Sequence, residues 1–197
     1  TMLLNFVDVK TIGPRDSVVG FATLNGLVHS ITGVHMSLYN ITDWLGLVPI
    51  AFALFFAILG LVQWIKRKNL IKVDYNLFVL GGFYVVVIAA YILFETVVIN
   101  YRPVLIDGFL EVSYPSSTTL LVLCVMPTAM MQLKNRIKNK TFRRCVLLSI
   151  TAFIIFMVVG RLISGVHWFT DIVGGALLSA SLVMMYRYFI GLTHSQT

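Results

Sequence analysis

Five long apolar runs limit what this chain can fold into. They cover residues 44–65, 76–99, 115–133, 145–166 and 170–190. Each is close to the roughly 20 residues that an α-helix needs to cross a lipid bilayer. The chain is 58% hydrophobic and only 12% charged, which is outside the range of soluble globular domains. The sequence therefore predicts an all-α, polytopic transmembrane helix bundle with five visible spans.

The basic residues separate the ends of these spans into two faces. Most of the fifteen basic residues follow the first, third and fifth spans: Lys66, Arg67, Lys68, Lys72, Lys134, Arg136, Lys138, Lys140, Arg143, Arg144 and Arg187. Short cytoplasmic loops are enriched in Lys and Arg, so we expect this face to be cytoplasmic. The net charge of +7 is then an orientation signal and gives no reason to expect nucleic-acid binding.

Residues 1–43 precede the first predicted span and fall on the outer face under this orientation. The stretch 17–40 mixes apolar residues with Ser, Thr, Asn and His, which predicts an amphipathic helix on or in the outer leaflet. A span leading to that face is either short and atypical or absent from the chain, and we favour absence. One domain covers 1–197, with an outer-face segment at 1–43 and the helix bundle at 44–190.

The segment "GRLISGVHWFTDI" places three ionisable residues between the last two spans, where such side chains are costly to keep. The four-residue step from His167 to Asp171 would put both on one helix face. The carboxylate could then hold one imidazole nitrogen and leave the other free to attack an electrophile. Arg161 lies about 240° from His167 on an ideal helix, so it joins them only if the backbone breaks, and Ser164-Gly165 is the predicted break. Alternatively, Arg161 and Asp171 merely neutralise each other.

A second polar cluster, "YPSSTT" at 114–119, opens the third span on the same face. Pro115 suits a first helical position, and Ser116 and Ser117 offer hydroxyls beside free backbone N–H groups, which favours anion binding. An ordinary helix cap is the alternative. Arg102, in "YRP" after the second span, and Arg161 would add bidentate donors suited to phosphate oxygens.

These three clusters occur in a characteristic order: Arg102-Pro103, then Pro115-Ser116-Ser117, then Arg161-x5-His167-x3-Asp171. The order resembles the type 2 phosphatidic acid phosphatase superfamily of membrane lipid phosphatases, which shares its site with vanadium haloperoxidases. The resemblance implies a six-helix core, here with the first helix missing or truncated. It also implies that His167 forms a phosphohistidine and that Asp171 orients it. By the same resemblance, the phosphoryl group is held by Arg102, Arg161, Ser116 and the Ser117 backbone amide.

Three positions depart from the family pattern. The first motif, K-x6-R-P, has Glu95 at its lysine; the second, P-S-x-H, has Thr118 at its histidine; the third, which usually begins Ser-Arg, has Gly160 before its arginine. The family uses that histidine as the general acid for the departing oxygen. A threonine hydroxyl cannot replace it, which should cost on the order of 10²–10⁴ in rate for an alkoxide leaving group.

The loss at Thr118 leaves two interpretations open. A diphosphate substrate would suffer less, because its leaving group is itself a phosphate and needs little protonation. Alternatively, Thr118 is an engineered, inactivating substitution. At the other changed position, Glu95 is predicted to support Arg102 or a neighbouring cation, with direct proton donation as the alternative, because an unpaired carboxylate would repel a phosphate ligand.

The sequence thus predicts a phosphatase in the cell membrane that acts on a lipid phosphate or diphosphate at the outer leaflet. The best candidates are a polyprenyl diphosphate or a phosphatidic acid-type lipid. No metal or cofactor is expected, because the arginines would take the role of a metal. The first alternative is a catalytically impaired relative that binds a lipid phosphate. A small transporter is the second, but it would need charged or helix-breaking residues near mid-membrane.

Overall fold

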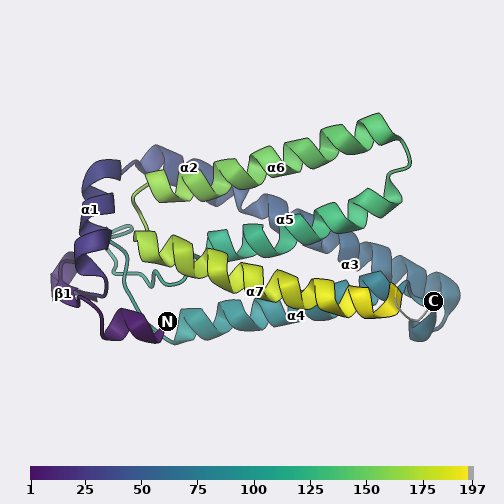
Figure 1. Cartoon of the computed structure of the whole chain (residues 1–197), viewed down its shortest axis with the longest axis horizontal. Helices are drawn as coiled ribbons and strands as arrows, with labels where there is room; N and C mark the ends of the chain where they lie inside the picture. Colours follow the sequence, from purple (N-terminus) through teal and green to yellow (C-terminus); the bar gives the residue numbers. More distant parts are fainter. Residues whose placement is uncertain (195–197) are drawn as a thin grey trace.

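The computed structural model describes residues 1–194, which form a bundle of long helices with a small folded segment at one end (Figure 1). The long helices are α3 (Leu47–Arg67), α4 (Tyr75–Thr96), α5 (Ser117–Arg136), α6 (Lys140–Ile163) and α7 (Phe169–His194). Among the described residues, five helical stretches are long and apolar enough to cross a membrane. The all-α class and the five predicted spans are therefore confirmed.

The first span begins earlier than the sequence indicated. It runs from Met36 to Arg67, because α2 (Met36–Leu45) leads directly into α3 through Gly46. α2 packs closely on α6, where a Cβ placed on Gly160 would lie 2.9 Å from Thr42 Cγ2. The predicted boundary at residue 44 is therefore wrong. Residues 36–43 belong to the bundle because polar side chains on α2 find partners on α6.

The single amphipathic helix predicted over 17–40 is also wrong. The chain instead forms α1 (Ala22–Thr32), which ends at Gly33 in a positive-φ conformation (64°) before α2 begins. A tight N-terminal segment comes before α1: helical turns η1 (Met2–Asn5) and η2 (Pro14–Asp16), and the antiparallel strands β1 (Lys10–Thr11) and β2 (Val18–Val19). Together these elements cover the end of the bundle where α7 starts (Figure 1).

α5 is the central helix of the bundle. It contacts α3, α4, α6 and α7, and half of its apolar window is buried, although its mean hydropathy of 1.2 is the lowest of the five spans. A helix enclosed by other helices can carry polar residues, because these find partners on its neighbours. Gln132, for example, donates to Tyr186 Oη at 2.7 Å. Because α5 is central, its N-terminus lies in the middle of the covered end of the bundle.

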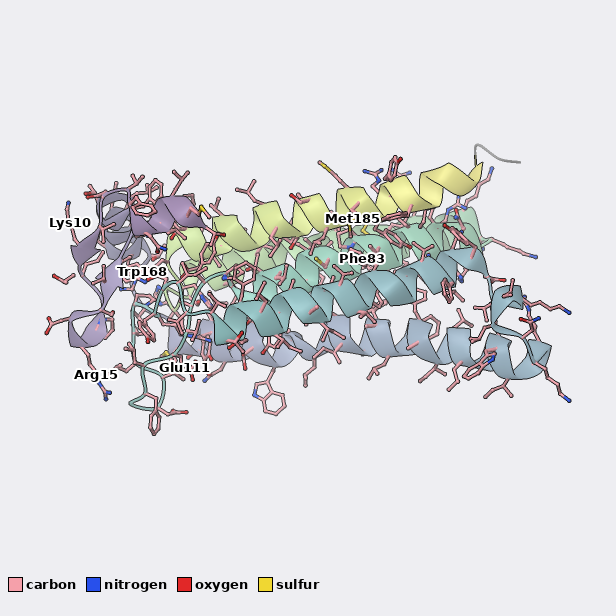
Figure 2. All side chains as sticks on the ribbon, turned by 90° about the horizontal axis from the view of Figure 1, so that it is seen from below. Lys10, Arg15, Phe83, Glu111, Trp168 and Met185 are labelled. Carbon is pink, nitrogen blue, oxygen red and sulfur yellow. The ribbon has the colours of Figure 1, made fainter. Side chains whose placement is uncertain are left out.

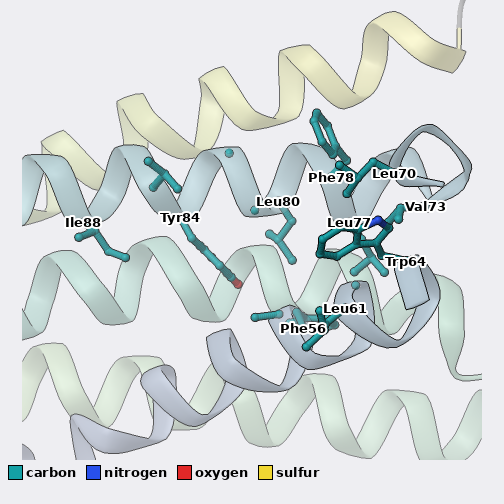
Figure 3. Close-up of a pocket in the computed structure, with 15 residues that line it drawn as sticks. Phe56, Leu61, Trp64, Leu70, Val73, Leu77, Phe78, Leu80, Tyr84 and Ile88 are labelled. Atoms are coloured by element: carbon teal, nitrogen blue, oxygen red, sulfur yellow. The ribbon is translucent and has the colours of Figure 1, made fainter. Parts of the chain in front are cut away.

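Two apolar grooves lie along the seam between α3 and α4. The groove far from the covered end has a volume of about 470 Å³, and Phe56, Trp64 and Tyr84 are among the side chains that line it (Figure 3). The second, of about 460 Å³, lies toward the covered end and reaches Thr118 at the start of α5. Ile88 lines both, so the two grooves meet at this residue.

Candidate active site

The turn between α6 and α7 brings the predicted residues together. α6 ends at Ile163 and α7 begins at Phe169, with Gly165 at φ +66° between them. A Cβ on Gly165 would lie 1.8 Å from the carbonyl oxygen of Gly33, so the turn packs directly against the α1–α2 connection. The predicted backbone break at Ser164-Gly165 is therefore confirmed, and it lets Arg161 approach the residues that follow.

His167 and Asp171 do not share a helix face, because His167 precedes the first residue of α7. Their closest atoms, Nδ1 and Oδ2, are 3.8 Å apart. Ser113 connects them: its hydroxyl donates a short hydrogen bond to Asp171 Oδ2 and lies 3.1 Å from His167 Nδ1. Because that hydroxyl has only one proton, it accepts from Nδ1–H. His167 Nε2 is then left with a free lone pair.

Asp171 is fully buried and held by two further donors. The backbone N–H of Trp168 donates to Oδ2 at 2.9 Å, and Asn100 Nδ2 donates to Oδ1 at 3.3 Å. Neither Ser113 nor Asn100 was expected in the site. Each lies two residues before a motif residue that was expected, Pro115 and Arg102 respectively, but no spacing rule identifies them. Only the packing of these segments against α7 shows their role.

The nucleophile candidate is neutral near pH 7. Burial lowers the pKa of His167 to about 4, and the nearby Arg102 and Arg161 guanidiniums act in the same direction. The carboxylate of Asp171 opposes this shift without reversing it. An unprotonated Nε2 is what attack on a phosphorus atom requires.

Arg161 is buried at the end of α6 and makes most of its contacts with α2 and α5. Its Nη2 donates to Asp43 Oδ1 at 2.9 Å and to Thr118 Oγ1 at 2.6 Å. The guanidinium also lies over the ring of Tyr39, 4.8 Å from its centroid. Arg161 therefore pairs with Asp43 rather than with Asp171. The alternative in which Arg161 and Asp171 only neutralise each other is excluded.

Arg102 approaches the same place from the segment between α4 and α5. Its guanidinium lies 5.6 Å from the centroid of the Tyr39 ring, so one aromatic side chain contacts both arginines. The Nε atom is 3.1 Å from Glu111 Oε2, a charge contact without the angle of a hydrogen bond. The carboxylate that contacts Arg102 is therefore Glu111, whereas support of Arg102 or a neighbouring cation by Glu95 stays a prediction. Trp168 and Glu111 mark this end of the molecule in Figure 2.

Ser116 is the N-cap of α5, so Pro115 precedes the helix and does not occupy its first position. The Ser116 hydroxyl lies 3.0 Å from Thr119 Oγ1, which donates to it, and accepts the Thr119 backbone N–H at 3.5 Å. Its hydroxyl thus makes an ordinary cap. The backbone N–H of Ser117 belongs to the first turn of α5, where no carbonyl of the helix can accept it. Glu95 lies nearby, in the lining of a small cavity that it shares with His167 and Ser117.

Four buried nitrogen atoms of this cluster have no hydrogen-bond partner among the described residues: Arg102 Nε and Nη1, Arg161 Nε and His167 Nε2. Buried polar atoms are normally paired with protein groups, water or a bound molecule, so these nitrogens are available to a ligand. Three are donors on cationic groups, and the fourth is the imidazole nitrogen with the free lone pair. Such a cluster is suited to a tetrahedral oxyanion held by arginines and attacked by imidazole.

Comparison with known proteins gives a family match. Residues 96–193, from the end of α4 into α7, match the model described as the PAP2 superfamily. No curated protein matches the chain. Among solved structures, the chain is similar to a transmembrane PAP2-type phosphatidylglycerolphosphate phosphatase from Bacillus subtilis. The two share 18% sequence identity and a TM-score of 0.47, covering 86% of this chain and 93% of that chain.

Proposed function

The chain belongs to the PAP2 superfamily of phosphatases, and from this premise we propose that it removes phosphate from a membrane lipid through a phosphohistidine on His167. The observation that carries the proposal is the set of four buried nitrogens on Arg102, Arg161 and His167 that have no hydrogen-bond partner among the described residues. The match covers all three residues. Their convergence in the folded chain gives the phosphoryl group a place beside a neutral imidazole.

The reaction proceeds in two steps. The lone pair of His167 Nε2 attacks phosphorus, and the bond to the departing oxygen breaks with its electron pair on that oxygen. Arg102, Arg161 and the Ser117 backbone N–H stabilise the charge on the other phosphoryl oxygens. Asp171, acting through Ser113, keeps the proton on Nδ1 and orients the ring. Water then releases phosphate and restores the imidazole.

A lipid diphosphate is the substrate that we favour, with phosphatidic acid and phosphatidylglycerol phosphate behind it. Thr118 supplies no acid, so a leaving group that needs little protonation is preferred. The apolar groove of about 460 Å³ that reaches Thr118 offers the tail a lateral path between α3 and α4. A polyprenyl diphosphate combines both properties, a phosphate leaving group and an apolar tail.

We further propose that the site faces the outer leaflet. The lysines and arginines after α3 and α5 lie at the opposite end of the bundle from His167, because each helix crosses its whole length. Basic loops favour the cytoplasm. The surfaces that a lipid substrate meets would then be the extracytoplasmic headgroup region and the α3–α4 seam.

Phosphate release from a panel of lipid phosphates and diphosphates tests this function. We expect the purified protein to release phosphate, with diphosphates turned over faster, and His167→Asn to abolish release by removing the attacking atom. Thr118→His should accelerate turnover of the monoesters. Activity that appears only in Thr118→His would instead identify a lipid-phosphate binding relative. An active His167→Asn variant would contradict the mechanism.

A further inference from the structure

Removing the phosphoryl group from His167 requires a base for the attacking water, and Thr118 cannot act as one. A hydroxyl with no titration near neutral pH neither donates nor accepts a proton efficiently. If the proposed function is correct, another ionisable group must lie where Thr118 meets the departing group. The described part of the chain offers three carboxylates near the site besides Asp171: Asp43, Glu95 and Glu111.

Asp43 is the carboxylate on the Thr118 side of the site. The Nη2 atom of Arg161 binds both residues, at 2.9 Å to Asp43 Oδ1 and 2.6 Å to Thr118 Oγ1, so the two side chains are held side by side. Asp43 and Thr118 also line the same apolar groove between α3 and α4. No other carboxylate is among the described residues lining that groove.

The other two carboxylates lie elsewhere. Glu95 lines the smaller cavity that contains His167, and Glu111 contacts Arg102 on the loop before α5. In an in-line displacement, the attacking and departing atoms lie on opposite sides of phosphorus. Water that attacks the phosphohistidine therefore arrives from the side opposite His167, where the leaving group has just departed. Of the three carboxylates, Asp43 is the one on the groove by which that group leaves.

The environment of Asp43 is suited to such a role. Its side chain is 56% exposed toward the groove end of the site, whereas the side chain of Arg161 is only 2% exposed. The arginine holds Oδ1 in place, and Oδ2 can accept a proton. The Arg161 charge also offsets the repulsion between the Asp43 carboxylate and a bound phosphoryl group.

We propose that Asp43 is the general base for the second step and replaces the histidine that the PAP2 pattern has at position 118. Water forms a bond to phosphorus while one of its protons moves to the Asp43 carboxylate. The bond from phosphorus to His167 Nε2 breaks, and its electron pair returns to the nitrogen. The ring, which keeps its Nδ1 proton, leaves as neutral imidazole. Hydrogen phosphate diffuses away, and Asp43 loses its proton to solvent.

Asp43→Asn tests the proposal in the full-length protein in detergent, with the lipid diphosphate that gives the fastest turnover as substrate. We expect the first step to persist, so one phosphohistidine per active site forms rapidly and then accumulates. Its decay and the steady-state kcat should fall on the order of 10²–10⁴-fold, the range of general-base assistance. Alkaline quenching preserves the phosphohistidine for measurement, and Asp43→Glu, which keeps a carboxylate, should retain much of the decay rate.

Asp74→Asn is the matched control. It also removes a carboxylate paired with an arginine, Arg67 at 3.1 Å, but at the far end of the bundle. We expect its phosphohistidine to form and decay at wild-type rates. Vanadate binding checks that Asp43→Asn keeps the arginine pocket intact.

Two results would overturn the role of Asp43. Unchanged phosphohistidine decay in Asp43→Asn would remove it from the second step. If Asp43→Asn loses both phosphohistidine formation and vanadate binding, Asp43 only orients Arg161. If the wild-type protein forms no phosphohistidine with any lipid, the proposed function itself fails, which is a separate outcome from either of these.

Discussion

At the scale of single residues, the site depends on hydroxyls and carboxylates that belong to no recognised motif position. Ser113 is the clearest example, because it connects His167 to Asp171 across a gap of 3.8 Å. Without its hydroxyl, the buried carboxylate loses a donor and the ring loses the acceptor that fixes its tautomer. The orientation of the His167 ring therefore depends on a residue from a different segment.

Ser113→Ala is expected to lower kcat/KM by about 10- to 100-fold, by analogy with the loss of a partner that orients a metal-bound imidazole. Ser113→Thr keeps the hydroxyl and should restore most of the activity. Ser181→Ala removes a hydroxyl that bonds only within α7, to Leu177 O at 2.9 Å, and should have no effect. Equal losses in the alanine and threonine variants of Ser113 would show a packing role instead.

At the scale of elements, the α6–α7 turn sets the geometry of the site. The turn needs glycine at position 165 for two reasons. The φ of +66° would strain any residue with a Cβ, and the backbone lies too close to Gly33 to leave room for a Cβ. The contact locks the turn against the α1–α2 connection. The contact thereby fixes the position of Arg161, before the turn, relative to His167, within the turn.

Gly165→Ala should destabilise the protein by at least about 1–2 kcal/mol, the cost of a left-handed backbone for an L-residue, and should sharply lower activity. The midpoint of thermal unfolding in detergent measures the first effect, and phosphate release the second. Gly191→Ala is the control, because a Cβ there meets nothing within 4 Å and an alanine suits a helix interior. A Gly165→Ala variant with wild-type stability and activity would contradict this account of the turn.

At the scale of the whole molecule, an apolar seam between α3 and α4 runs along the bundle from the candidate site. The two grooves along it meet at Ile88, which lines both. A tail that extends from the phosphate pocket along this seam would pass that residue. Under the proposed function, the seam would give a lipid tail a path that avoids the covered end.

Ile88→Trp should obstruct the seam and lower kcat/KM at least tenfold for a long-tailed diphosphate. A short-tailed analogue, which does not reach Ile88, should be turned over at the wild-type rate. Ile155→Trp adds the same bulk on the outer surface of α6, where Ile155 is 59% exposed, and should affect neither substrate. Equal sensitivity of both substrates to Ile88→Trp would argue against the seam as the tail site.

Much of the architecture follows from local sequence, because membrane-spanning helices satisfy their backbone hydrogen bonds within each segment. Apolar length was therefore enough to predict five spans. The break at Ser164-Gly165 was also predictable, since an ideal helix would point Arg161 away from His167. The start of the first span was misplaced because α2 is polar, and only its contacts with α6 through Thr42 and Asp43 place it in the bundle.

By itself, the sequence determined the helical class and the number of spans, since these depend on length and hydropathy. Motif order predicted Arg102, His167 and Asp171 as site residues. The tertiary structure alone decided which side chains meet. Ser113 lies 54 residues from His167, and Asp43 lies 118 from Arg161, and no local pattern encodes either contact. Hydrogen bonds act over about 3 Å, so such partners become apparent only when distant segments pack together.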